Sequence, residues 1–137
     1  MGMDQHLVKL VPVYGGNDRP EGLPSNVSHI LVEVGYWRNN YILDQFLDEL
    51  LGDHGYERHD SGMRCNRMTE ITDRVDELVD MLEFALSDPG RQTAPIGRIL
   101  VKAQQQGDDV PTRLREAIEP FRPYVGTDDR LLYQADY

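Results

Sequence analysis

The spacing of hydrophobic residues predicts two strands near the N-terminus. Residues 6–14 are rich in valine and leucine, and Pro12 restricts this strand to a sheet edge or a bulge, because proline lacks the N–H that a sheet ladder needs. A second apolar run covers residues 29–34. Between them, residues 15–28 are dense in glycine, proline, asparagine and serine, which is typical of a loop. We expect an N-terminal β-hairpin with a long loop.

The strongest helical pattern follows directly, over residues 35–51. Its apolar positions recur at i, i+3, i+4, i+7 and i+8, namely Leu43, Phe46, Leu47, Leu50 and Leu51. Extended backwards, this stripe reaches Asn39 and Asn40, so either neighbouring backbone satisfies the two amides or the stripe opens into a polar pocket. Asp44 is expected on the solvent-facing side, and Gly52 is well placed to end the helix.

The middle of the chain predicts a loop and then a helix. Residues 52–68 are polar and contain three glycines, which favours a long loop. Thr72 can cap a helix whose buried stripe runs from Val75 to Leu86, and AspProGly at 88–90 ends it.

The remaining residues complete a small domain. Residues 96–106 fit a strand or a helix equally well, whereas Asp109 and Pro111 predict the start of a helix that ends before residue 120. LeuLeuTyr at 131–133 predicts a last strand. Without an internal repeat, residues 1–137 form one α+β domain: an N-terminal β-hairpin or short sheet, about three helices and a short C-terminal strand.

Composition narrows the class of function. The 137 residues suffice for one core. The chain has 24 acidic and 14 basic residues and a net charge of −10, which opposes binding to nucleic-acid phosphates. Its single cysteine, Cys65, fits a reducing cytoplasm, and no apolar run is long enough to span a bilayer. We expect no membrane association.

Several polar groups suggest chemistry without defining it. His54 and His59 lie among carboxylates but match no established metal-ligand spacing, so we interpret them as part of a solvated loop. Cys65 lies between Arg64 and Arg67, yet a nucleophile would need a partnered histidine, and we interpret this cysteine as structural. We therefore assign no catalytic residue, no metal and no cofactor.

TyrTrpArg at residues 36–38 is a different kind of candidate, because it suggests ligand binding instead of catalysis or metal binding. Aromatic faces can stack on a base, a guanidinium can pair with phosphate, and a helix beginning near Gly35 would add its free amides. The alternative is an aromatic pair that seals the core with Arg38 directed outward, which the chemistry alone favours.

The same stretch resembles a widespread family of short bacteriophage proteins. Members carry a pattern like EVGYWRKANxIHxWF, then a cysteine-bearing turn into a helix, and they end near YYQ. The matching residues here are Glu33, Val34, Gly35, Tyr36, Trp37 and Arg38, then Cys65 before Thr72, and Tyr133, Gln134, Ala135 and Tyr137. Phe46 replaces a tryptophan, Tyr41 replaces an asparagine and Asp44 replaces a histidine.

Small phage proteins of this kind include sponges that sequester the nucleotide signals of immune systems such as Thoeris and CBASS. From the resemblance and the aromatic and arginine motif, we expect a homo-oligomer in the cytoplasm of the infected bacterium. It would bind a cyclic nucleotide or a cyclic ADP-ribose type of signal without turnover. The expected ligand-binding residues are Tyr36, Trp37, Arg38, Asn39, Asn40, Tyr41, Tyr133 and Gln134.

Two alternatives stay open. One is a protein-interaction module that inhibits or adapts a host or phage protein and uses an acidic surface. The other is an enzyme that degrades the same signal with His54, His59 or Cys65.

Overall fold

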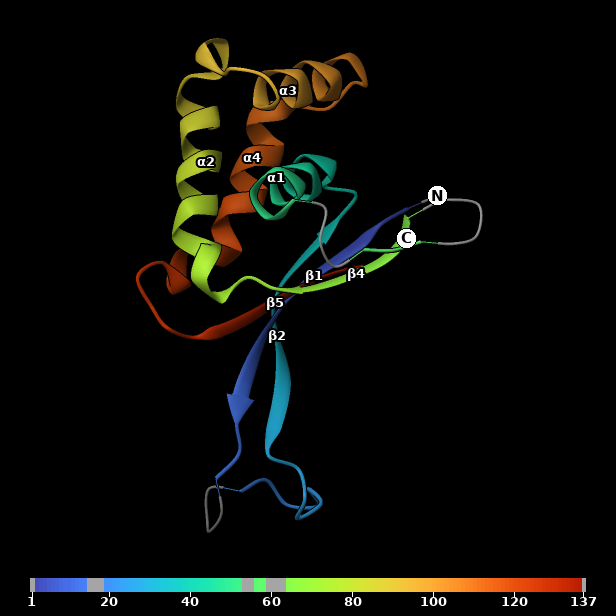
Figure 1. The fold of residues 1–137 in the computed structure, drawn as a ribbon, viewed down its shortest axis with the longest axis vertical. Coiled ribbons are helices and arrows are strands. Elements are labelled where there is room, and N and C mark those ends of the chain that lie inside the picture. The colour runs from blue at the N-terminus through green and yellow to red at the C-terminus, as the bar shows by residue number, and fades with distance from the viewer. Residues whose placement is uncertain (1, 15–18, 53–55, 59–63, 137) are drawn as a thin grey trace.

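A five-stranded antiparallel sheet in the order β2-β1-β5-β4-β3 organises the protein, and the helices cover one of its faces (Figure 1). The computed structural model describes residues 2–14, 19–52, 56–58 and 64–136, without the side chains of 56–58 and 64–67. The second face of the sheet carries no helix in the described part of the chain.

The strands and helices have these bounds. The strands are β1 (Asp4–Pro12), β2 (His29–Arg38), β3 (Tyr56–Arg58), β4 (Arg64–Glu70) and β5 (Arg130–Asp136). The α-helices are α1 (Tyr41–Leu51), α2 (Val75–Ser87), α3 (Ile96–Gln105) and α4 (Val110–Ile118). Short 3-10 helices are η2 (Thr72–Arg74), η3 (Pro89–Arg91) and η4 (Glu119–Tyr124). The predicted α+β class is confirmed, and the ambiguous residues 96–106 are helical up to Gln105.

Strand β1 is internal to the sheet, not at its edge. It pairs with β2 over its whole length, but with β5 only from Asp4 to Leu10. Pro12 therefore lies beyond the end of the β5 ladder, where the missing N–H costs no second hydrogen bond. The bulge that proline suggested lies elsewhere, where the β1–β2 register shifts between Leu7 and Val8.

The main correction concerns the start of the first helix. Residues 35–38 belong to β2, which pairs with β1 down to Arg38 opposite Asp4, and α1 begins only at Tyr41. Tyrosine and tryptophan pack well on a pleated sheet, so the pairing with β1 overrides the helical period. Asn39 makes the turn in a left-handed conformation, with φ of 56°. The expected helix N-terminus beside Gly35 is therefore wrong.

The predicted loop at 52–68 is wrong at two strands, the first of which is β3 at Tyr56–Arg58, paired with β4. Residues 64–70 form β4, which pairs with β5 from Asn66 opposite Asp136 to Glu70 opposite Leu132. The partner strand is distant in sequence, so the local polar pattern did not reveal it. The described part of the other predicted loop, residues 19–28, contains neither helix nor strand.

Helix ends match the sequence in part. Gly52 ends α1 with a φ of 71° and donates its N–H to the Asp48 carbonyl, and Asp109 caps α4 by accepting from the Thr112 N–H. Thr72 is not a side-chain cap. Its hydroxyl accepts from the Leu131 N–H and donates to Glu70, so it joins the start of η2 to β5 instead.

The core lies between the sheet and the helices. Alternate residues of β5 are buried against it (Leu131, Tyr133 and Ala135), as the period of a half-covered strand requires. Asp44 of α1 is also buried, at 3% exposure, although the sequence placed it on the solvent-facing side. Its hydrogen bond with a buried tyrosine, described below, explains this position.

Candidate functional site

The sheet divides the eight predicted ligand-binding residues between its two faces. Successive side chains of a strand point to opposite faces, so Tyr36 and Arg38 lie on the open face while Trp37 points towards the helices. On β5, Tyr133 points to the helices and Gln134 to the open face. His6 lies opposite both Tyr36 and Gln134, which places these two residues on the same face but two strands apart. The eight residues therefore do not form one pocket.

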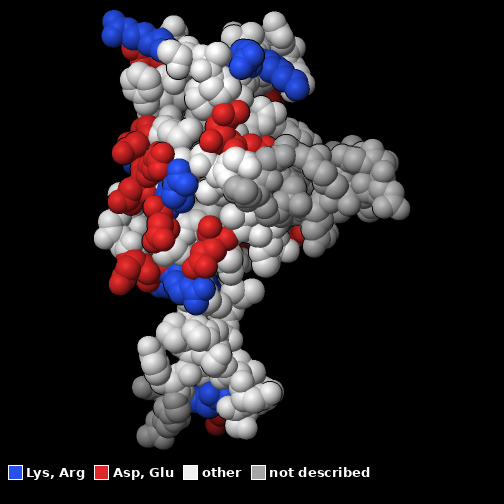
Figure 2. All heavy atoms as spheres, viewed as in Figure 1, with Lys and Arg blue, Asp and Glu red and all other residues white. Residues whose placement is uncertain are grey.

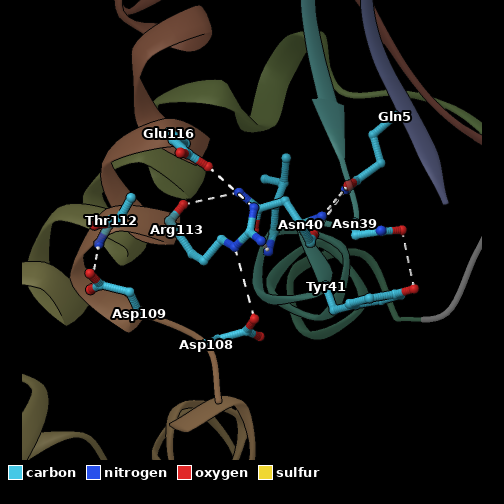
Figure 3. Close-up of polar contacts among 10 residues, drawn as sticks. Gln5, Asn39, Asn40, Tyr41, Asp108, Asp109, Thr112, Arg113 and Glu116 are labelled. Carbon is cyan, nitrogen blue, oxygen red and sulfur yellow. Dashed lines mark hydrogen bonds and ion pairs between the residues drawn. The ribbon is translucent and has the colours of Figure 1, made fainter. Parts of the chain in front are cut away.

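Asn40 is a structural joint between β2, α1 and α4 (Figure 3). Its side-chain oxygen accepts from the Leu43 N–H at 3.2 Å and caps α1, while its amide donates to the Arg113 carbonyl at 3.0 Å. Its main-chain N–H and C=O bond to the side chain of Gln5. With 1% exposure, Asn40 has no surface for a ligand, so of the two expectations for the asparagines, satisfaction by neighbouring groups is correct for it.

Asn39 and Tyr41 flank this joint. The Asn39 side-chain oxygen accepts from the Met3 N–H at 2.6 Å and from the Tyr41 hydroxyl at 3.3 Å. These bonds hold the N-terminus against the turn between β2 and α1. Tyr41 is partly exposed, and neither residue lines the hollow described below.

A buried polar chain continues from Gln5 into the core. The Gln5 amide donates to the Tyr133 hydroxyl at 2.7 Å, and this hydroxyl donates to an Asp44 carboxylate oxygen at 2.9 Å. Buried polar groups need such partners, because an unsatisfied one costs about 1–3 kcal/mol. Tyr133 is therefore a core residue. Sequence reasoning missed Gln5, although the alternation of Gln5 and Leu7 would have extended the strand to it.

Three predicted residues do share one hollow. Tyr36, Trp37 and Arg38 of β2 line a hollow of about 470 Å³ together with Arg113 and Glu116 of α4 and with Glu119 and Pro120 of η4. Trp37 forms its inner wall: it is 4% exposed, stacks on Phe121 at 5.4 Å between ring centroids, and donates its indole N–H to the Glu116 carbonyl at 2.7 Å. Tyr36 is 52% exposed, so of the two aromatic residues only Tyr36 presents its ring to solvent.

Asp4 of β1 holds the polar ends of Tyr36 and Arg38, although it does not itself line the hollow. One of its carboxylate oxygens accepts from the Tyr36 hydroxyl and from the Arg38 guanidinium, each at 2.6 Å. The Tyr36 hydrogen bond and then the Arg38 hydrogen bond hold the pKa of Asp4 below its usual value. The same carboxylate raises the pKa of Tyr36 and of Arg38. A phenol and a guanidinium thus converge on one anionic oxygen.

Arg113 contributes a second guanidinium. It lies 3.4 Å from Glu116 and 3.9 Å from Asp108, and Figure 3 shows it between them, beside the Asn40 joint. Both distances are long for ion pairs. A guanidinium has five N–H donors, which is more than these two contacts use. The Asn40 bond to its backbone fixes the position of this residue on α4. Sequence reasoning missed Arg113 because its proximity to β2 depends on how α4 packs.

A second hollow, of about 550 Å³, lies among α2, η3, α3 and α4. Leu86, Leu100, Val101 and Leu114 give it apolar walls, and Asp108 and Asp109 lie at its edge. Its lining contains neither an aromatic nor a cationic side chain, so it does not suit an anionic ring compound.

The other chemical candidates fall outside the described residues. This is true of His54 and His59 and of the side chain of Cys65. Among the residues that are described, no three or more histidine, cysteine and acidic side chains are grouped as a metal site would require. Within the same residues, none of the helices combines the length and the apolarity needed to cross a bilayer.

Comparisons of the chain with protein-family models, with curated proteins and with solved structures return no match. In the described residues, the fold and the hollow define a class: an α+β domain with one sheet face free of helices and, at the β2 edge, a hollow lined by aromatic and charged residues.

Proposed function

We propose that this protein binds a small nucleotide-derived ligand in the hollow beside Tyr36 and Arg38, without turnover. In this proposal it is a homo-oligomeric phage sponge for a bacterial immune signal, of the cyclic nucleotide or cyclic ADP-ribose type, in the host cytoplasm. The observation that carries it is the convergence of the Tyr36 hydroxyl and the Arg38 guanidinium on one carboxylate oxygen of Asp4, beside a hollow that Tyr36, Arg38 and Arg113 line.

The geometry supports an anion with an attached ring. A ligand phosphate would replace the Asp4 carboxylate as the acceptor for Tyr36 and Arg38, because phosphate oxygens accept the same two hydrogen bonds. The exposed Tyr36 ring is available for stacking on a base. Arg113 supplies donors to a second phosphate oxygen, and Trp37 keeps the inner wall rigid. The volume of the hollow falls within the range of small-molecule sites.

A thermal-shift panel of cyclic nucleotides and cyclic ADP-ribose isomers tests this proposal. A ligand at about 100 times its dissociation constant stabilises the fold by roughly 2.7 kcal/mol. We expect one member of the panel to raise the melting temperature and Arg38→Ala to abolish that shift. Asp4→Asn should strengthen binding, because it removes the carboxylate that competes with the ligand.

Arg98→Ala is the matched control, since Arg98 is an exposed arginine of α3 away from the hollow. It should leave the shift unchanged. A panel without any shift removes the sponge proposal. Mass spectrometry of the ligand released by heat denaturation separates binding from turnover: intact ligand supports a sponge, and altered ligand supports the enzyme alternative.

A second candidate is a protein-interaction module with an acidic docking surface. One observation favours it: acidic side chains gather on the α2 side of the molecule (Figure 2). Exposed members along η2 and α2 are Asp73, Asp76, Glu77 and Asp80. Such a face suits a basic protein partner. Charge reversal at Asp73 and Asp80 should then abolish co-purification of a specific partner, while Arg38→Ala leaves it intact.

A further inference from the structure

The outer edge of β2 is one of the two edges of the described sheet, the other being β3. β2 pairs with β1 on its inner side, and the strand order leaves no strand on its other side. Residues 35–38 of β2 lie near α4 and η4, where Gly35 approaches Pro120 and Trp37 bonds to Glu116. Within the described chain, no main-chain hydrogen bond is formed by the outer edge of residues 29–33. This segment is therefore available for pairing.

The same segment belongs to a hairpin that extends beyond the rest of the sheet. β5 stops pairing with β1 at Leu10, whereas β1 and β2 continue to Pro12 opposite His29 (Figure 1). Large apolar side chains are exposed on both faces of this hairpin: Leu31 is 52% exposed, and Val32, which points to the opposite face, is 40% exposed. Tyr14 beyond the strand end is 72% exposed.

An exposed apolar edge is a template for another strand. Natural proteins protect such edges with lysine, proline, bulges or a covering element. Residues His29, Ile30, Leu31, Val32 and Glu33 include no lysine and no proline, and the register shift lies at their far end, after Glu33. A partner strand that covers this edge would satisfy its main-chain groups and bury Leu31.

The order of side chains in this segment is complementary to itself. A twofold axis perpendicular to a sheet keeps the two faces distinct, so only residues with the same parity can lie opposite each other. With the axis at Leu31, the two leucines face each other, Ile30 faces Val32 of the second copy, and His29 faces Glu33, whose carboxylate also contacts His6 of its own chain. An imidazole opposite a carboxylate and aliphatic residues opposite one another are favourable cross-strand pairs.

The neighbouring registers lack this complementarity. With the axis at Val32, Glu33 lies opposite Leu31, and with the axis at Ile30, His29 lies opposite Leu31. Both place a polar side chain against the most exposed aliphatic one of the segment. The acidic side chains on the α2 side of the molecule also lie away from the hairpin, so they would not repel a second copy that docks there (Figure 2).

We propose that two copies of this chain pair antiparallel through residues His29–Glu33 of β2, with Leu31 on the twofold axis, and join their sheets into one. This interface uses residues outside the hollow. It therefore stands or fails independently of ligand binding, while it gives the expected homo-oligomer a defined contact.

Sedimentation velocity of the intact chain gives the first test. We expect a dimer that becomes monomeric in Leu31→Lys, because that substitution places two ammonium groups opposite each other on the axis. Val101→Lys is the matched control, since Val101 is an equally exposed aliphatic residue on α3. It should remain dimeric. A monomeric wild-type protein overturns the proposal.

Cysteine cross-linking tests the register. In a Cys65→Ser background, Leu31→Cys should form a covalent dimer when oxidised with diamide, because directly opposite Cα atoms lie within disulfide range. Val32→Cys is also exposed in this hairpin, at 40% for the native side chain, but lies opposite Ile30 of the second copy, so it should not cross-link. A dimer without cross-linking at position 31, or with equal cross-linking at position 32, overturns this interface whatever the result of the ligand panel.

Discussion

Asn40 shows how much one side chain can determine in this fold. It ends the turn after β2, caps α1 and bonds to the backbone of α4, while its main chain bonds to Gln5. The Gln5 amide then continues to Tyr133 and Asp44. Residues that the sequence marked as ligand-binding or solvent-facing are thus members of one buried polar chain. Their side chains satisfy each other's hydrogen bonds, so the polar residues at these positions have a structural role.

The Asn40→Ala variant tests this role. It removes the cap at the Leu43 N–H, which costs about 1 kcal/mol on average, and the part-buried hydrogen bond to the Arg113 carbonyl, which adds about 0.5–1.5 kcal/mol. We expect a loss of roughly 1.5–2.5 kcal/mol in the free energy of unfolding, measured by urea denaturation.

Asp109→Ala is the control for the cap alone, because Asp109 caps α4 at an exposed position. Its loss should stay near 1 kcal/mol. Equal losses in the two variants would contradict the structural role of Asn40.

At the scale of elements, the contact of β2 with η4 positions the hollow. Gly35 makes this contact possible, since a Cβ at this position would lie 2.7 Å from the Pro120 Cβ and 3.2 Å from the Leu7 Cβ. Its neighbours on β2, Tyr36 and Trp37, then lie beside α4 and η4. Glycine is required here for close approach of two elements.

Gly35→Ala should therefore destabilise the fold. The proline ring cannot rotate away, so β2 and η4 must separate, and overpacking of this kind costs about 1–3 kcal/mol. Gly90→Ala is the matched control, because Gly90 has nothing within 4 Å of an added Cβ. Its effect should stay within about 0.5 kcal/mol. Thermal or urea unfolding measures both, and an unchanged Gly35→Ala protein would refute the close contact.

At the scale of the whole molecule, acidification has two opposite effects on stability. One acts through the net charge of −10, and the other through two ion pairs on the open face of the sheet. Asp4 pairs with Arg38, and Glu70 pairs with Arg130 at 2.9 Å. The hydrogen bond from Arg130, and then that from Thr72, lowers the pKa of Glu70, as Tyr36 and Arg38 do for Asp4. Self-repulsion weakens as the protein is acidified, whereas these two pairs are lost only at lower pH.

We expect the free energy of unfolding to be highest near pH 5 and to fall below about pH 4. A carboxylate with a lowered folded pKa stabilises the fold above its ordinary pKa, 3.8 for Asp4 and 4.5 for Glu70, and this contribution disappears as the pH falls through the folded value. Urea denaturation across pH measures it. The Asp4→Asn, Glu70→Gln variant should lose stability less steeply on the acid side.

Asp73→Asn with Asp128→Asn removes the same charge from exposed positions and serves as the control. Its free energy of unfolding should fall with decreasing pH as steeply as that of the wild-type protein. If both double variants behave alike, the loss of stability at low pH arises from the net charge and not from the two ion pairs.

Predictability from sequence differed between element types. The helix α2, the end of α1 at Gly52 and the cap at Asp109 were predicted, because each depends on a period or residue within a few positions. The last strand was predicted as well, but not its place between β1 and β4. Of the candidate site, only Tyr36, Trp37 and Arg38 line a common hollow, and Arg113 and Asp4 were found only through packing.

The sequence by itself determined the α+β class, the hairpin and the helical stripes, since hydrophobic period and turn residues act locally. Tertiary structure alone decided where β2 ends, that Asp44 and Tyr133 are buried, and which side chains of TyrTrpArg reach solvent. In each case the deciding partner is distant in sequence: β1 extends β2 as far as Arg38, and Gln5 bonds to Asn40 and Tyr133. Local propensity is weak beside such contacts, because a sheet ladder and a buried hydrogen bond are satisfied only by residues that the fold brings together.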